Sequence, residues 1–275
     1  MKSHPYLGIN EEVKKIVKPL LSNGDAYHKV HTARLARTAH VLGDTVAMEG
    51  GNNCKVLELG TSGFLPVVLK SLFPSVSIDV TSFDQSESLE EILANPDDVS
   101  EKEVGIGGES VRVTAFSVDL EYELIPAPDE TYDVVVCCEV LEHMEIDPMF
   151  MLSEVNRVLK TGGKLFLTTP NVLSSRGITK MLEGYEPYFF MQYHKNREYH
   201  RHNYEYSVRS LWSLLKCAGF DSTVWTEDLF EDGLPHSVNR LRDAGFVIEN
   251  VGDNILAIGT KISEVVERHP RGLYV

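Results

Sequence analysis

Short apolar runs that alternate with helical segments are the feature that most restricts the fold of this chain. The run over residues 132–138 is apolar almost throughout, as expected of a strand that is buried on both faces of a sheet. Strands that alternate with helices are typical of a parallel sheet with helices packed against it, so we predict an α/β fold. The predicted strands of this sheet are residues 55–59, 76–83, 111–118, 132–138 and 164–168.

The connections inside this alternation carry both helix and loop signals. We predict helices over 86–94 and 148–159, the second of them closed by Gly162 and Gly163. A polar, glycine-rich stretch precedes the strand predicted at 111–118. Its three glycines lack a preceding strand and a following helix, so we interpret them as a loop. They are Gly105, Gly107 and Gly108.

The segments outside the alternation predict a helical cover and an insertion. Residues 11–50 have helical spacing, and Asn10 has the residue type of an N-cap. Residues 171–206 lose any period and are longer than an ordinary connection, which favours a functional insertion on the acceptor side. After the insertion, Ser207 caps a predicted helix that precedes two final strands. The predicted parts of one domain over 1–275 are the helical cover 1–50, the core 51–170, the insertion 171–206 and the C-terminal helix and strands 207–275.

Composition restricts the possible partners. The formal net charge of −15 repels polyphosphate, so extended nucleic-acid binding is disfavoured and a small acceptor fits better. The apolar stretches are much shorter than a membrane span, and the first residues lack the pattern of a signal peptide. Four cysteines without metal-site or disulfide spacing are typical of reduced thiols. We expect a cytoplasmic protein, and the sequence leaves its oligomeric state open.

Polar residues at the ends of the predicted strands indicate a ligand site, because ligands of open α/β sheets bind beyond the carboxyl ends of the strands. The first such end is VLELGTSGF, in which Gly60 permits a tight turn, Gly63 permits close backbone approach and Glu58 could reach a positively charged group. Asp84 and Asp119 end the second and third strands. Each aspartate has the alternative role of capping the next helix or turn.

The stretch VLELGTSGF resembles the first motif of class I S-adenosylmethionine-dependent methyltransferases, although Ser62 and Phe64 stand where the family usually has glycines. The stretches VTSFDQSE, FSVDLE, YDVVVCCEVLEHM and EVNRVLKTGGKLFLTTPN resemble the later family motifs in the same order. This resemblance implies a Rossmann-like, mostly parallel seven-stranded sheet with helices on both faces. It also implies that Asp84 meets the ribose hydroxyls of S-adenosylmethionine and Asp119 the adenine amino group. The expected cofactor-binding residues are Glu58, Gly60, Thr61, Ser62, Gly63, Asp84, Gln85, Asp119, Leu120 and Glu139.

The segment EVLEHM after the fourth predicted strand carries the candidate catalytic groups. Glu139, Glu142 and His143 share one face if the chain turns helical there, and such a set could hold a divalent ion. The segment is similar to the E-x-x-E-H element of ubiquinone-pathway O-methyltransferases and small-RNA 2′-O-methyltransferases, which implies a divalent metal (Mg, Mn or Zn). In the RNA group a later histidine completes the metal site, and His202 matches it. His143, with Glu139, could instead act directly in acid–base catalysis, or His143 could be a packed polar group.

The C-terminal half suggests the acceptor. RHNYEYS, followed by a helix that ends in AGF, resembles methyltransferases of bacterial glycan and polysaccharide biosynthesis, with Tyr204 in place of their usual arginine. This resemblance implies O-methylation of a sugar or similar hydroxyl on a small, nucleotide-linked or free, intermediate. Terminal 2′-O-methylation of a small RNA and a non-catalytic, cofactor-binding partner protein remain alternatives. His194 and His200 are further candidate ligands, or part of a solvated lid.

Overall fold

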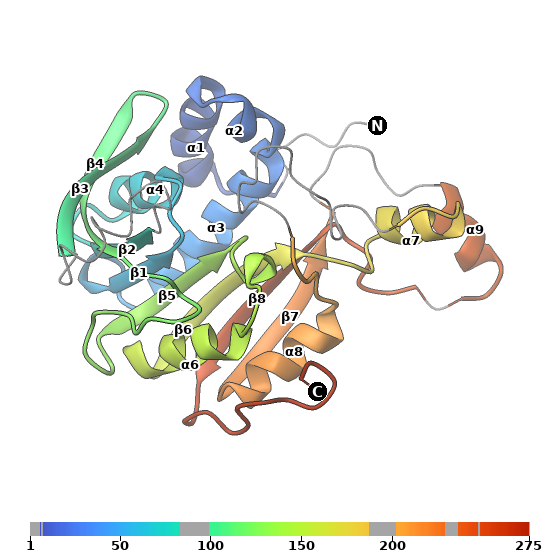
Figure 1. The fold of residues 1–275 in the computed structure, drawn as a ribbon. Helices are drawn as coiled ribbons and strands as arrows, with labels where there is room; N and C mark the ends of the chain where they lie inside the picture. Colours follow the sequence, from blue (N-terminus) through green and yellow to red (C-terminus); the bar gives the residue numbers. More distant parts are fainter. Residues whose placement is uncertain are drawn as a thin grey trace, which may run out of the picture.

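A computed structural model describes residues 6, 8–82, 99–186, 202–228, 236–246 and 248–274 of the chain. Within this part, eight strands form one mixed sheet in the order β3-β4-β2-β1-β5-β6-β8-β7 (Figure 1). The pairs from β4 to β6 are parallel, and the pairs that involve β3, β7 and β8 are antiparallel. The strands are β1 (Lys55–Leu59), β2 (Ser77–Ser82), β3 (Val99–Ile106), β4 (Glu109–Ser117), β5 (Tyr132–Cys138), β6 (Leu159–Pro170), β7 (Phe220–Glu227) and β8 (Asn254–Lys261).

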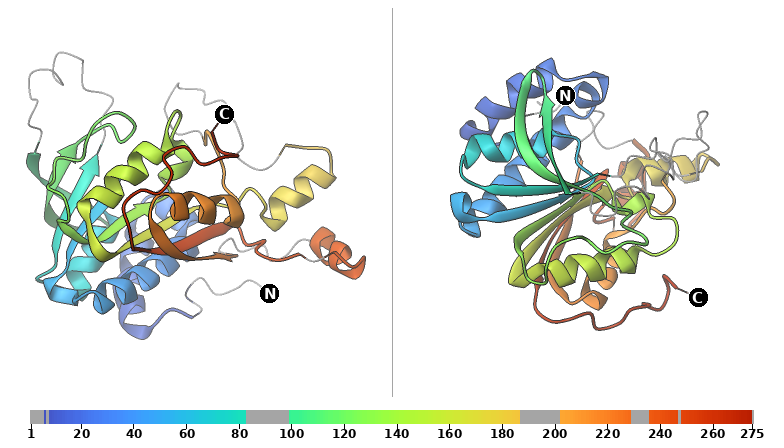
Figure 2. Two further views of the ribbon diagram at one scale, coloured as in Figure 1. Left: turned by 90° about the horizontal axis from the view of Figure 1, so that it is seen from below. Right: turned by 60° about the vertical axis from the view of Figure 1, so that its left-hand side comes forward.

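Helices cover both faces of this sheet, which confirms the predicted α/β architecture (Figures 1 and 2). One apolar core joins the sheet to α1, α3 and α4, and a second joins its other face to α6 and α8. Parallel strands that are covered on both faces need apolar side chains throughout, and β5 accordingly buries Val134, Val135 and Val136 completely. The helices are α1 (Glu11–Asn23), α2 (Ala26–Val30), α3 (Thr32–Met48), α4 (Phe64–Leu72), α6 (Pro148–Val158), α7 (Ser175–Leu182), α8 (Val208–Cys217) and α9 (His236–Asp243), with 3-10 turns η1 (Gly51–Asn53) and η2 (Leu141–His143).

The N-terminal helical cover forms as predicted. The side chain of Asn10 accepts a hydrogen bond from the amide of Val13 at 2.8 Å and so caps α1. Pro19 is accommodated inside this helix. The apolar stripe of α3 includes Leu35, Ala39 and Leu42, all of which are buried in the core. The cover therefore packs on one face of the sheet and brings α2 and α3 to the edge where β1 and β5 end.

The strand β3 corrects the predicted strand count of seven and the loop predicted at its glycines. β3 pairs antiparallel with β4, and Gly107 and Gly108 form the two-residue turn between them with φ values of 63° and 91°. Gly105 lies within β3. The strand was missed because its sequence, VSEKEVGI, is mostly polar. The hairpin exposes most of these side chains, so the strand needs little apolar character.

The boundary between α6 and β6 also differs from the prediction. The helix ends at Val158 and β6 begins at Leu159, so Gly162 and Gly163 lie inside the strand and do not close the helix. The register with β5 shifts by three residues here, because Tyr132 pairs with Leu159 while Val134 pairs with Lys164. Gly162 has the positive φ of 85° that this bulge requires.

Beyond β6, the described part of the insertion contains α7, which lies beside α9 and away from the sheet (Figure 2). No signal in the sequence predicted α9.

The helix predicted over 86–94 lies outside the described residues, as do His194 and His200. The four cysteines form no disulfide. Among the described helices, none is long and apolar enough to span a lipid bilayer.

Candidate active site

The candidate site lies where the carboxyl ends of β1 and β5 meet. Leu59 pairs with Cys137, so the loop after β1 and the turn after β5 leave the sheet side by side. A Cβ atom on Gly60 would lie 2.9 Å from Cγ2 of Val140, which shows how closely the two segments approach. β1 has β2 on one side and β5 on the other, so the chain reverses its strand order at this point. Such reversal points are where open α/β sheets bind ligands.

The loop after β1 is held by hydrogen bonds to its own residues and to β2. The amide of Gly60 donates to Thr81 Oγ1 at 3.0 Å, and the amide of Gly63 donates to Thr61 Oγ1 at 3.0 Å. Both glycines have positive φ, 66° and 82°. Gly60 and Ser62 are exposed at the sheet edge. The loop is therefore open to a ligand and has a fixed backbone.

Gly63 permits another backbone segment to approach closely, and this segment belongs to the β3–β4 hairpin and not to a ligand. A Cβ atom on Gly63 would lie 2.8 Å from the amide nitrogen of Gly105 and 2.9 Å from its carbonyl oxygen. The strand β3 thus packs directly against the start of α4. The glycine at this position is required by the hairpin, irrespective of any ligand.

Glu58 is buried immediately before this loop. It is 5% exposed, and its Oε2 atom has no hydrogen-bond partner among the described residues. Burial raises the pKa of this carboxyl to about 7, against a smaller lowering by the hydroxyl of Thr61. A buried acceptor of this kind fits a cationic or hydrogen-bond-donating group of a ligand.

The two predicted aspartate sites differ in what the structure describes. Asp84 and Gln85 lie outside the described residues. Asp119 follows β4, and its Oδ1 accepts from the amide of Glu121 at 2.9 Å, which is the turn-capping alternative. Leu120 packs partly against the core of α6 and α8.

The chain turns sharply after β5, and this turn separates Glu139 from Glu142 and His143. Glu139 has a φ of 56°, and only one 3-10 turn, η2, follows it. The predicted shared helical face does not form, because the left-handed conformation at Glu139 redirects the chain before a helix begins. Among the described residues, Glu139 is absent from the cluster that could hold a metal, which contains Glu142, His143 and His202.

Glu139 is instead the counter-ion of a buried arginine. Its Oε1 accepts from Thr168 Oγ1 at 2.8 Å and from Asn254 Nδ2 at 2.9 Å, and its Oε2 lies 3.2 Å from a guanidinium nitrogen of Arg34. Arg34 is 5% exposed and also donates to the hydroxyl of Tyr27 at 2.6 Å. Burial opposes ionisation of Glu139, but Arg34 and the two hydrogen bonds outweigh it and lower the pKa.

Glu142 has the opposite electrostatic environment. It is fully buried, and burial together with the nearby negative charge of Glu139 raises its pKa well above the ordinary value. Its Oε2 accepts from Thr169 Oγ1 at 2.9 Å, whereas Oε1 has no hydrogen-bond partner among the described residues. Oε1 lies 3.9 Å from Nε2 of His143. A buried carboxylate oxygen of this kind favours a nearby cation or a hydrogen-bond donor.

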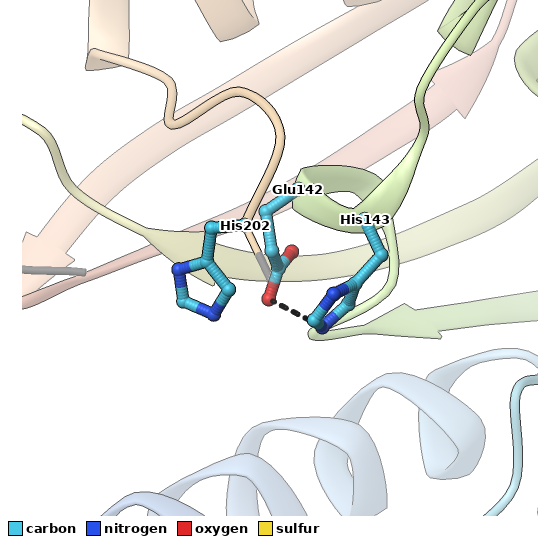
Figure 3. A group of neighbouring side chains, drawn as sticks. All are labelled: Glu142, His143 and His202. Atoms are coloured by element: carbon cyan, nitrogen blue, oxygen red, sulfur yellow. Dashed lines mark ion pairs between the residues drawn. The ribbon is translucent and has the colours of Figure 1, made fainter. Parts of the chain in front are cut away.

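His143 and His202 flank this carboxylate, as Figure 3 shows. One ligand atom from each of Glu142, His143 and His202 lies within 4.8 Å of the other two. The two imidazole rings are nearly perpendicular, at 79°, with centroids 5.2 Å apart. The group predicted from the sequence also contained Glu139, and the fold brings the other three members together across the insertion.

Two residues of the site were not predicted. Arg34 lies on α3, more than a hundred residues before its partner Glu139, and no local pattern indicates such a contact. Glu205 is buried, and its Oε1 lies 2.8 Å from Nδ1 of His202. The spacing of three residues between His202 and Glu205 was the available signal for this second contact.

Solved structures define the class of protein to which this fold belongs. The chain is similar to a SAM-dependent methyltransferase of Thermotoga maritima, with a TM-score of 0.51 and 18% identity over 90% of this chain and 99% of that one. It is also similar to the magnesium protoporphyrin IX methyltransferase of Synechocystis PCC 6803 with bound SAH, with a TM-score of 0.51 and 14% identity over 86% and 88%. The fold is thus that of Rossmann-like methyltransferases.

Sequence comparison gives the family. Residues 21–224 match the family described as Methyltransferase domain, and this chain belongs to that family. It is 28% identical over 116 residues to the ubiquinone biosynthesis O-methyltransferase of Coxiella burnetii, which is 42% of this chain and 43% of that protein. An uncharacterized methyltransferase of Schizosaccharomyces pombe is 33% identical over 89 residues, 32% and 31% of the two chains. The matches therefore span less than half the length of these relatives.

Proposed function

We propose that this protein is an S-adenosylmethionine-dependent methyltransferase that O-methylates a hydroxyl group of a sugar or another small biosynthetic intermediate. The observation that carries the proposal is the cluster of Glu142, His143 and His202 beside the open loop after β1. A hydroxyl is a poor nucleophile and must lose its proton during methyl transfer, so it needs such groups. The similarity to ubiquinone biosynthesis O-methyltransferases supports an oxygen acceptor.

The cofactor would bind along the loop after β1. Among the described residues, no partner meets the buried Oε2 atom of Glu58, and this acceptor fits the ammonium group of the cofactor. Gly60, Thr61, Ser62 and Gly63 would line its path. The remaining cofactor contacts that we propose are Asp84, Gln85, Asp119, Leu120 and Glu139.

His143 is the residue that we propose to accept the proton of the acceptor hydroxyl. It is partly exposed next to Glu142, so an acceptor can reach it. Glu139 is a less suitable base than the sequence suggested, because Thr168, Asn254 and Arg34 engage both of its oxygens. We assign it the task of holding Arg34 and the end of β5 in place.

The cluster also fits a divalent ion. Glu142, His143 and His202 would supply one oxygen and two nitrogens, a donor set that suits Zn or Mn, and Oε1 of Glu142 still has capacity to bind a cation. When bound, such an ion would lower the pKa of a coordinated hydroxyl. The three side chains would then orient the hydroxyl toward the methyl donor, and the helical cover would exclude water.

Calorimetry with S-adenosylhomocysteine tests both parts of the proposal. Chelator-treated protein should bind the nucleoside with micromolar affinity, and Mn²⁺ should give a separate isotherm that disappears in His143→Ala and His202→Ala. The matched control is His269→Ala, which removes an exposed histidine of the C-terminal segment. Methyl transfer to nucleotide-sugar and phenolic acceptors should fall in the same two variants. Failure of the wild-type protein to bind the nucleoside under all these conditions would contradict the proposal and favour a non-catalytic partner protein.

Terminal 2′-O-methylation of a small RNA remains the second candidate. It is favoured by the meeting of His202 with Glu142 and His143, since the resemblance to the RNA enzymes rests on this later histidine. The net charge of −15 opposes it.

A further inference from the structure

We infer that Glu205 is a positioning residue of this site, because it determines which ring nitrogen of His202 faces Glu142 and His143. The catalytic consequence rests on the proposed function, whereas the orientation itself is a property of the folded chain. Glu205 is only 6% exposed, and its Oε1 lies 2.8 Å from Nδ1 of His202. A buried carboxylate needs a hydrogen-bond partner, and the imidazole supplies one.

The backbone first fixes where His202 enters the site. The amide of Asn203 donates to the carbonyl of Glu142 at 2.7 Å, and its side-chain amide donates to the carbonyl of His143 at 2.8 Å. At the other end of this short segment, the amide of Val172 donates to the carbonyl of Tyr206 at 3.0 Å. Residues 202–206 are thereby tied both to η2 and to the chain after β6. These backbone contacts place the Cα atom of His202 beside the cluster.

Glu205 holds the Nδ1 edge of the His202 ring. A carboxylate oxygen accepts this hydrogen bond and Nδ1 of His202 donates it, so in the neutral imidazole the lone pair lies on Nε2. The lone pair therefore lies on the nitrogen that points away from Glu205. His202 needs that lone pair in either proposed role, as a metal ligand or as a proton acceptor.

The contact distinguishes His202 from His143. The carboxylate next to His143, that of Glu142, lies 3.9 Å from its Nε2, which is too long for a hydrogen bond. The contact between Glu205 and His202 is within hydrogen-bond distance and is partly buried, so it restrains the ring of His202. We assign Glu205 to His202 alone.

Nitrogen NMR of the histidine ring tests this assignment without a metal, a cofactor or turnover. In chelator-treated protein with ¹⁵N-labelled histidine, His202 should show the Nδ1–H tautomer. Glu205→Met keeps a similar volume but has no acceptor, so the ring should change toward the Nε2–H tautomer, and methyl transfer should fall about 10- to 100-fold. The control Glu154→Gln alters another buried carboxyl, which pairs with Arg157, and should leave the His202 ring signals unchanged.

A second variant covers the case in which Glu205→Met fails to fold. Glu205→Gln keeps an oxygen acceptor without the charge, so the Nδ1 signal should shift and methyl transfer should fall about 3- to 10-fold, since hydrogen bonds to a neutral acceptor are about half as strong. Wild-type ring signals in a folded Glu205→Met protein, or wild-type signals and turnover in Glu205→Gln, would overturn the assignment. A change of tautomer in a protein that neither binds S-adenosylhomocysteine nor transfers a methyl group would refute the proposed function and leave the positioning role intact.

Discussion

At the scale of single residues, three of the carboxyl groups of the site have three different environments. Glu58 is buried without a cation, Glu139 is paired with Arg34, and Glu142 is buried next to a like charge. Their pKa values consequently move in different directions. Each carboxyl is therefore suited to a different task, and only Glu139 is already fully engaged by the protein.

The raised pKa of Glu58 predicts a pH-dependent affinity for the cofactor. The carboxylate form binds an ammonium group, and this carboxyl has a pKa of about 7 in the free protein. Affinity for S-adenosylhomocysteine should therefore fall about tenfold per pH unit below pH 7 and level off above pH 8. In Glu58→Gln the affinity should be about 10- to 100-fold lower at pH 8, since a charge-assisted hydrogen bond contributes about 1.5–3 kcal/mol. The affinity of this variant should also no longer depend on pH through this residue.

Calorimetric titrations at pH 6, 7 and 8 check the slope. The amide variant should be at least as stable as the wild type at pH 8, because the folded wild-type protein must ionise a buried carboxyl whose unfolded pKa is lower. Parallel pH profiles for the two proteins would show that Glu58 does not meet the ammonium group.

Site residues could be predicted where a short sequence motif contains them. Roles that depend on a partner far away in the sequence could not be predicted. The E-x-x-E-H segment and His202 could be proposed together because the segments that contain them resemble the metal-binding elements of known O-methyltransferases. The role of Glu139 could not be predicted, because Arg34 and Asn254 reach it from separate elements. The left-handed backbone conformation of Glu139 could not be predicted either, since it accompanies the sharp turn after β5.

At the scale of elements, the hairpin of β3 and β4 is the main departure from the predicted sheet. It adds an antiparallel edge, and two of its glycines pack against neighbouring elements. A Cβ atom on Gly107 would lie 2.8 Å from the carbonyl oxygen of Leu20 in α1, and Gly105 approaches Gly63 at the start of α4. The hairpin therefore packs against the start of α4, where the loop after β1 ends.

Two glycine variants measure this packing. Gly63→Ala should lower the free energy of unfolding by about 3 kcal/mol or more, because it combines a left-handed residue with a clash against Gly105. Gly108→Ala is the matched control: its φ is also positive, at +91°, but nothing lies within 4 Å of the new Cβ, so it should lose only about 1–2 kcal/mol. Urea unfolding at pH 7 gives both values, and equal losses would contradict the packing role of Gly63.

Buried elements were predictable, whereas exposed ones were not. β1 and β5 could be predicted from their apolar runs, because both faces of these strands are covered and nearly every side chain is buried. By contrast, β3 exposes most of its residues, and α9 lies beside α7 away from the sheet, so neither needs an apolar pattern. The bulge in β6 was missed because its glycines carry the same signal as a helix end.

At the scale of the whole molecule, the sheet separates two apolar cores, and the candidate site lies at one edge between them. The net charge of −15 of the chain as a whole disfavours binding of long polyanions such as nucleic acids. The net charge therefore favours O-methylation of a small molecule over 2′-O-methylation of an RNA, although both reactions would use the same cluster of side chains.

Binding of a short labelled RNA distinguishes these functions. We expect no binding at micromolar protein in 150 mM salt, as measured by fluorescence anisotropy, because few phosphate contacts can form on an acidic surface. A repeat at 50 mM salt serves as the sensitive control. Tight binding that weakens steeply between the two salt concentrations would instead favour the RNA function.

Glu139 joins parts of the chain that are made at very different times. It meets Arg34 from α3 and Asn254 from β8, so a growing polypeptide carries Arg34 and Glu139 long before their third partner leaves the ribosome. Contacts between residues so far apart in sequence form slowly. The first strands can assemble during synthesis, but the end of β5 acquires its full set of partners only after translation has passed residue 254. Completion of the site is thus tied to completion of the sheet.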